Sequence, residues 1–176
     1  MFSRSAKKLA TENELYDAAL RALMRRAHSV HEMRALLERR AERADDVSAV
    51  LARLRQNKYL DDAKFAADFA RIHAQERRQG RYRITRELRN RGVPDGHIEA
   101  ALDAAFANTS EAELIAAKLK RKLAAFRGPI DQRKAASLYR SLLRDGFSSD
   151  AVRDALRAAR IDAAAVAEAA ESPKEE

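Results

Sequence analysis

The stretch ITRELRNRGVPDGHIEAAL, which runs from Ile84 to Leu102, decides the fold of this chain. Its large apolar anchors lie four residues apart, then ten apart across a turn at Gly92, then four apart again. Residues four apart share one face of an α-helix. The stretch therefore predicts two amphipathic helices joined by a short turn.

The same skeleton occurs in two other places along the chain. Displaced by 54 residues toward the C-terminus, its positions are Leu138, Leu142, Gly146, Val152 and Leu156. Displaced by 51 residues toward the N-terminus, they are Met33, Leu37, Ala41, Val47 and Leu51. A fixed internal period of this length indicates an array of similar small modules.

Each copy follows another amphipathic segment, as Tyr16, Leu20 and Leu23 illustrate for the first. The sequence thus predicts an all-α protein of three tandem three-helix, helix–turn–helix-like repeats. Because the linkers are short, we expect the repeats to form an elongated curved array. The expected parts are a frayed N-terminal segment over 1–13, modules over 14–60, 61–108 and 109–160, and an acidic, alanine-rich tail over 161–176, in which 163–170 can prolong a helix.

Capping residues support these helix boundaries. Two pairs fit the capping box, in which a hydroxyl and a carboxylate satisfy orphan amides: Ser29 with Glu32, and Ser110 with Glu113. Further N-caps are expected at Asp61, Asp131 and Ser148. Gly92 and Gly146 stand where a helix ends in a left-handed residue. Ala41 adopts that conformation less readily, so we expect the first module to turn differently, over residues 41–44.

Composition bounds the class of protein. Aromatic residues make up only 6% of the chain and tryptophan is absent, so the core must consist mainly of alanine and leucine. The absence of cysteine excludes disulfides and thiolate metal sites. The first residues lack the apolar run of a signal peptide, and no run is long enough to span a membrane. We expect a soluble cytoplasmic protein that is monomeric.

Basic residues concentrate in two places. Residues 71–91 contain eight arginines against Glu76 and Glu87, and residues 118–127 contain five basic residues and no acid. Such an imbalance favours a polyanion or an acidic protein surface as partner, and arginine suits bidentate contacts with phosphate or carboxylate. The predicted partner-binding residues are Arg77, Arg78, Arg81, Arg83, Arg86, Arg89, Arg91, Lys118, Lys120, Arg121 and Lys122.

No pattern in the sequence indicates catalysis. His28 and His31 are three residues apart, but no cluster of acids completes a metal shell around them. Gly92 and Gly96 lack the strand–turn–helix setting of a phosphate-binding loop. We therefore expect a protein that is not an enzyme and has no metal and no cofactor.

Alternatives remain for the basic residues. Arg83 and Glu87 are spaced to form an i,i+4 ion pair, as on any solvated helix. Tyr82, in an expected loop, either stacks on a base or packs at a module interface, and the second is the commoner outcome. The repeated helix–turn–helix also suggests reading of the DNA major groove, although three-helix modules often do not bind DNA.

Three stretches of the chain resemble the RecX family of bacterial RecA regulators. They are YLDDAKFA at 59–66, GRYRITRELRNRGV at 80–93 and SVHEMRALLERR at 29–40. The resemblance extends from about Glu14 to Arg160, with a departure at Ala41–Ala44, where the family usually carries a glycine turn.

The resemblance implies a non-enzymatic protein of tandem three-helix repeats that binds the filament of RecA on single-stranded DNA. Family members restrain RecA by impeding filament growth or favouring disassembly, which suppresses its recombinase, ATPase and coprotease activities. Direct contact with single- or double-stranded DNA is a further expectation. The alternatives are a helix–turn–helix DNA-binding regulator that acts without RecA, and a general helical scaffold.

Overall fold

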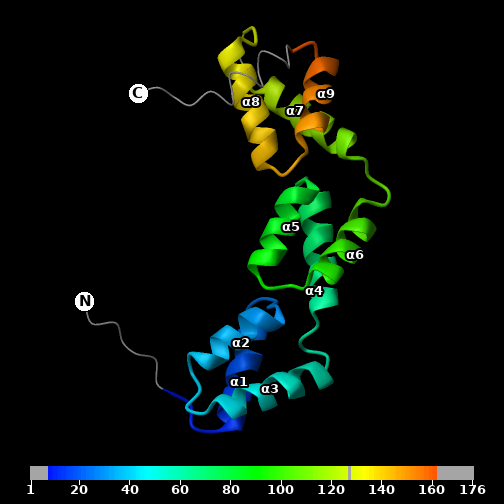
Figure 1. The fold of residues 1–176 in the computed structure, drawn as a ribbon. Coiled ribbons are helices and arrows are strands. Elements are labelled where there is room, and N and C mark those ends of the chain that lie inside the picture. Colours follow the sequence, from blue (N-terminus) through cyan, green and yellow to red (C-terminus); the bar gives the residue numbers. More distant parts are fainter. Residues whose placement is uncertain (1–7, 127, 162–176) are drawn as a thin grey trace, which may run out of the picture. The chain divides into compact units, whose positions relative to one another are not determined.

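The computed structural model describes residues 8–126 and 128–161 (Figure 1). In these residues it contains nine α-helices and no strand. The helices are α1 (Glu12–Leu23), α2 (Val30–Glu38), α3 (Ala44–Gln56), α4 (Asp62–Arg71), α5 (Arg81–Asn90), α6 (Asp95–Phe106), α7 (Glu111–Ala124), α8 (Gln132–Arg144) and α9 (Ser149–Ala158). The predicted all-α fold of tandem three-helix repeats is confirmed, with α1–α3, α4–α6 and α7–α9 as the first, second and third modules.

The repeating apolar anchors form the cores of the modules. In the first module Met33, Leu37 and Leu51 are buried together with Leu15 of α1. In the third module Leu142 and Leu156 belong to a separate core cluster. Burying each such side chain stabilises the fold by about 1.5–3 kcal/mol. The apolar period therefore reports packing within modules rather than contact with a partner.

Every predicted N-cap is present in the structure. The capping boxes at Ser29 and Ser110 are both complete. The side chains of Asp61, Asp131 and Ser148 each accept a hydrogen bond from the backbone N–H three residues later. A further capping box, between Thr11 and Glu14, was not predicted from the sequence.

The three turns differ as their residues require. Gly92 and Gly146 have φ of +71° and +90°, in the left-handed region predicted for them. In the first module Ala41 does not adopt a positive φ, and the chain instead reaches α3 through an extended residue at Arg43. Ala41 pairs with Leu9 in an isolated parallel bridge. The expected difference in the first turn is thus confirmed.

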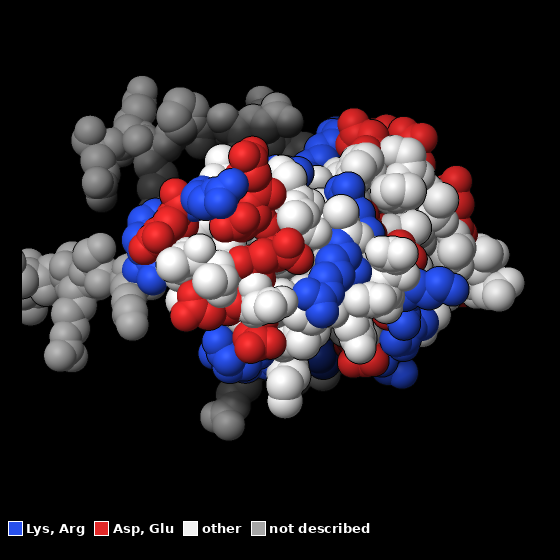
Figure 2. All heavy atoms as spheres, turned by 90° about the horizontal axis from the view of Figure 1, so that it is seen from below, with Lys and Arg blue, Asp and Glu red and all other residues white. Residues whose placement is uncertain are grey.

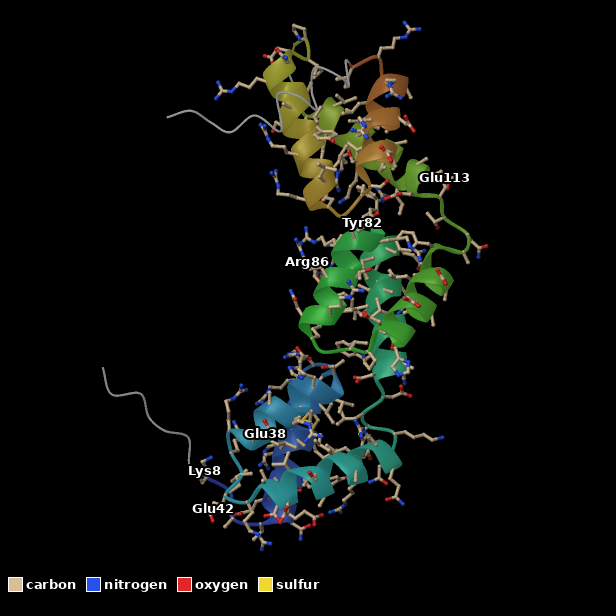
Figure 3. All side chains as sticks on the ribbon, viewed as in Figure 1. Lys8, Glu38, Glu42, Tyr82, Arg86 and Glu113 are labelled. Atoms are coloured by element: carbon tan, nitrogen blue, oxygen red, sulfur yellow. The ribbon has the colours of Figure 1, made fainter. Side chains whose placement is uncertain are left out.

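Two expectations about irregular segments are wrong. Tyr82 was expected in a loop but lies on the first turn of α5, which begins at Arg81. Before that helix, α4 continues into a π-helical turn over Ile72–Glu76. The segment before Glu14 is not wholly frayed, since Leu9 N–H donates to the Arg40 carbonyl at 2.7 Å and α1 starts at Glu12. In Figure 3 the neighbouring Lys8 lies beside the first turn, and its Nζ donates to the Ala41 carbonyl at 3.1 Å. Most of the predicted acidic tail, 162–176, lies outside the described residues, as do residues 1–7.

The chain divides into two compact units whose boundary passes through the middle module. One unit comprises residues 1–68 and 88–99, and the other comprises 69–87 and 100–176. Each unit thus contains one terminal module together with part of the second module. None of the helices in the described part of the chain is both long and apolar enough to cross a membrane.

Each unit contains a junction between successive modules, and the two junctions are built alike. In one unit Ser29 Oγ donates to the Arg91 carbonyl at 2.5 Å. In the other Gly80 N–H donates to the Asp145 carbonyl at 2.8 Å. Ser29 and Gly80 are 51 positions apart, and Arg91 and Asp145 are 54 apart, which are the displacements of the repeat. In both junctions, therefore, the turn of one module docks on the helix start of the module before it.

Candidate partner-binding surface

The predicted arginines of the middle module lie on the loop before α5, on α5 itself and, for Arg91, in the turn that follows it. Arg77 and Arg78 follow the π-helical turn, with Arg78 at φ +51°. Arg81, Arg83 and Arg86 occupy the first two turns of α5. The hydrogen bond from Tyr82 N–H to the Gly146 carbonyl, at 3.1 Å, fixes this end of α5 against the turn between α8 and α9.

Four of the predicted arginines are held in ion pairs within the protein. Arg81 pairs with Asp103 and Arg83 pairs with Glu87, at 2.7 and 2.8 Å. The Arg83–Glu87 pair is the i,i+4 pair that the sequence suggested.

In the other unit Arg89 pairs with Asp95 and Arg91 pairs with Glu32, again at 2.7 and 2.8 Å. The pKa of the exposed Arg89 is raised, first by its hydrogen bond to Asp95. For Glu32, burial raises the pKa, but hydrogen bonds from Arg26 and the Ser29 N–H, with the charge of Arg91, lower it overall. These arginines contribute to internal structure and are less available to a partner than their number suggests.

Lys118 departs most from expectation. Its side chain is only 6% exposed, and its Nζ lies 2.6 Å from Asp145 Oδ2 and 5.6 Å from the centroid of the Phe147 ring. Burial lowers the pKa of Lys118, and the hydrogen bond to Asp145 opposes this shift. A side chain in this position does not reach a partner, so we remove Lys118 from the predicted surface.

The remaining predicted residues form no ion pair with any described residue. They are Arg77, Arg78, Arg86, Lys120, Arg121 and Lys122. All of these except Lys122 are exposed, and Lys122 is half-buried with its Nζ donating to Ser141 Oγ at 2.7 Å. We define these six residues as the unpaired basic set.

The two basic stretches of the sequence meet at Asp145, within one unit. Asp145 contacts Lys118 of α7 and also lies 3.8 Å from Arg83 of α5. Beside it, Lys122 and Arg144 line a small cavity of about 240 Å³ between α7 and α8. No pattern in the sequence predicts this meeting, because it depends on the docking of Gly146 against α5.

Tyr82 is the functional candidate whose setting was mispredicted. It is 68% exposed on the first turn of α5, so it does not pack at an interface between modules. Arg86 lies one turn further along the same helix (Figure 3). The exposed Arg133, Arg140 and Arg144 of α8 add basic groups that were not among the predicted residues.

The histidines and acids show no catalytic arrangement in the described part of the chain. His73 is buried, stacks on Phe69 and lies 2.6 Å from Gln79 Oε1 through Nδ1. Burial lowers the pKa of His28, whose Nδ1 donates to the Arg26 carbonyl. No group of three or more His, Cys, Asp or Glu among the described residues is placed to hold a metal ion.

Figure 2 shows one face of the molecule, on which basic and acidic side chains are interspersed among uncharged residues. Neither charge covers that face continuously. Pairing within the protein, rather than the net charge of +8, distinguishes the candidate residues: four arginines and Lys118 have carboxylate partners, and the other six form no ion pair with a described residue. The unpaired basic set belongs wholly to the unit of residues 69–87 and 100–176.

Comparisons of the sequence and of the fold with known proteins agree with one another. The family description "RecX, second three-helix domain" matches residues 61–102, which include α4, α5 and most of α6. A regulatory protein RecX of Halorhodospira halophila is 39% identical over 87% of this chain and 92% of its own. One of Herbaspirillum seropedicae is 35% identical over 82% of this chain and 90% of its own.

This chain belongs to the RecX family. The crystal structure of RecX from Lactobacillus salivarius has the same fold, with a TM-score of 0.71 at 19% identity over 84% of this chain and 95% of that one. The relatives are named regulatory proteins, and the RecX domain match covers the module that carries Tyr82 and most of the arginines discussed above.

Proposed function

We propose that this protein binds the filament of RecA on single-stranded DNA and restrains its growth, recombinase, ATPase and coprotease activities. Membership of the RecX family supports the proposal, and the observation that carries it is the unpaired basic set. Arg77, Arg78 and Arg86 are exposed on one segment and form no ion pair with a described residue, so their charges are available to a polyanionic or acidic partner.

The direct test is ATP hydrolysis by RecA on single-stranded DNA, with and without this protein, over a series of salt concentrations. We expect inhibition that weakens as salt rises, because exposed charges are screened. The variant Arg77→Glu/Arg78→Glu/Arg86→Glu should require at least about tenfold more protein for half-inhibition, since a hydrogen bond to a charged group contributes about 1.5–3 kcal/mol.

A matched control reverses three exposed arginines of the first module that also form no ion pair with described residues, Arg25→Glu/Arg34→Glu/Arg43→Glu. Both variants change the net charge equally, and circular dichroism should show unchanged helicity for both. Equal loss of inhibition in the two variants would reduce the effect to net charge and refute the assignment of the surface.

The alternative regulator predicts a different outcome. A helix–turn–helix protein that acts without RecA would shift naked duplex DNA in a sequence-selective manner and leave RecA hydrolysis unaltered. A general scaffold would neither shift duplex DNA nor alter ATP hydrolysis by RecA.

A further inference from the structure

The ring of Tyr82 is more exposed than the other large apolar side chains in the described part of its unit. Among the described residues, the large apolar side chains that are strongly exposed are Met24, Tyr59 and Tyr82. Met24 and Tyr59 belong to the unit of residues 1–68 and 88–99. In the described part of the other unit, Tyr82 is thus the one large apolar side chain that is strongly exposed.

Contacts within the unit fix the backbone that carries the Tyr82 ring. Tyr82 lies on the first turn of α5, and its backbone N–H is fixed to the Gly146 carbonyl. The preceding residue, Arg81, is tied to Asp103 and lies 5.4 Å from the centroid of the Phe106 ring. An aromatic ring with only two side-chain torsions, carried on a fixed helix, loses little entropy when it binds a partner.

The surroundings of Tyr82 are cationic. Arg86 lies four residues along the same helix, where side chains become neighbours, and Arg78 lies in the loop before α5. Both are exposed and form no ion pair with a described residue. The carboxylate of Glu87, on the same helix, is already paired with Arg83.

This composition fits a single-stranded nucleic acid better than a protein surface. The centre of a protein interface needs several apolar side chains that become buried together, and α5 with the loop before it presents Tyr82 as its one strongly exposed large apolar side chain. A single strand requires an aromatic face for an unpaired base and arginines for the adjacent phosphates. In a duplex the bases are already stacked on each other, so their faces are not available to the ring.

We propose that Tyr82 stacks on an unpaired base of single-stranded DNA while Arg78 and Arg86 bind the flanking phosphates. The biological setting of this site rests on the proposed function, since the filament supplies the strand. The contact itself is intrinsic to this chain and is expected with naked DNA. It assigns this part of the basic surface to DNA rather than to the RecA subunits.

The experiment uses the full chain and a thymine oligonucleotide of about 15 nucleotides, without RecA. Because the chain contains no tryptophan, the variant Tyr82→Trp carries a single reporter. We expect its fluorescence to be quenched on titration with the oligonucleotide, and much less by an abasic strand of the same length or by a duplex. The control Tyr59→Trp places the reporter on the exposed tyrosine of the other unit and should show little quenching.

Affinity gives the second readout. Tyr82→Ala should weaken binding of the oligonucleotide roughly 5- to 150-fold, the range for loss of one stacked base, whereas Tyr82→Phe should bind nearly as the parent does. Equal quenching by the abasic strand, or unaltered binding by Tyr82→Ala, overturns the proposal. If Tyr82→Ala loses inhibition of RecA but binds the oligonucleotide normally, the ring contacts a RecA subunit. The stacking site is then refuted, and the proposed function stands.

Discussion

At the scale of single residues, the junctions between modules depend on the absence of a side chain at two turn glycines. A Cβ built on Gly92 would lie 2.3–2.8 Å from side-chain atoms of His31. One built on Gly146 would lie 2.4 Å from the backbone nitrogen of Arg83. Both glycines also have positive φ, which other residues adopt only with strain. The turns therefore need glycine for conformation and for close approach at once.

Gly92→Ala should destabilise the protein by about 1–3 kcal/mol, because the new methyl group combines a strained φ with overpacking against His31. Gly96, four residues later in α6, is the matched control. A Cβ there meets nothing within 4 Å, so Gly96→Ala should stabilise the protein by up to about 1 kcal/mol. Urea denaturation measures both changes. Similar effects of the two substitutions would show that Gly92 serves only as a flexible position.

For Lys118, the burial of the side chain could be predicted from the sequence, but its ion-pair partner could not. The residue lies three and four positions after Ile115 and Leu114, on the buried stripe of α7, so its spacing already placed it on the core face. The count of basic residues obscured that signal. Its partner, Asp145, lies in another turn of the chain and was not predictable, because that contact requires the packed positions of α7 and α8.

At the scale of elements, the two junctions carry equivalent ion pairs of opposite polarity. In one unit Arg91 of the later module pairs with Glu32 of the earlier one, at 2.8 Å. In the other Asp145 of the later module lies 3.8 Å from Arg83 of the earlier one. Glu32 and Arg83 are equivalent under the 51-residue displacement, and Arg91 and Asp145 under the 54-residue one. Each turn is therefore complementary to its own docking site and would place like charges together at the other.

A double-mutant cycle tests this complementarity. Arg91→Glu alone should destabilise the first junction, since it sets two carboxylates against each other. Adding Glu32→Arg should recover part of the loss, with a coupling energy of about 0.5–1.5 kcal/mol, because Arg26 loses its own pairing with Glu32. Thermal or urea unfolding of the four proteins measures the coupling.

The exposed pair Arg89–Asp95 supplies the control cycle. Its two atoms are 2.7 Å apart, but both side chains are 60% exposed, so swapping its charges should give a smaller coupling. A coupling at Glu32 and Arg91 no larger than that of this exposed pair would mean that the charges do not select between the turns.

The helices themselves were predictable, because apolar period and capping are local properties. The caps at Ser29, Asp61 and Ser148 needed only the residues next to them. The start of α5 was not predictable in this way. Arg81 and Tyr82 are helical in part because Tyr82 N–H donates to Gly146, a residue of the following module. The exposure of Tyr82, on which the stacking site depends, thus followed from a contact that no local pattern records.

At the scale of the whole molecule, the division into two units does not follow the three modules. The boundaries at 68/69, 87/88 and 99/100 fall inside α4, α5 and α6. In arrays of repeats, stability is close to a sum of local terms and contacts between neighbours. The stability of the middle helices therefore depends in part on each of the two terminal modules. The unpaired basic set and Tyr82 lie in one unit, so disturbance of the other should spare them.

Hydrogen exchange of the full chain tests this coupling with one core truncation in each unit. Leu37→Ala and Leu142→Ala each remove a fully buried side chain and should cost about 2–5 kcal/mol. Leu37→Ala should speed exchange in α1–α3 and in residues 88–99, and Leu142→Ala in α7–α9 and in residues 69–87, because local opening follows cooperative units. Peptides from the two halves of α5 should respond to different variants. Uniform acceleration along the chain by either variant would instead show a single cooperative unit, and loss of the first module's core would then also abolish binding at Tyr82.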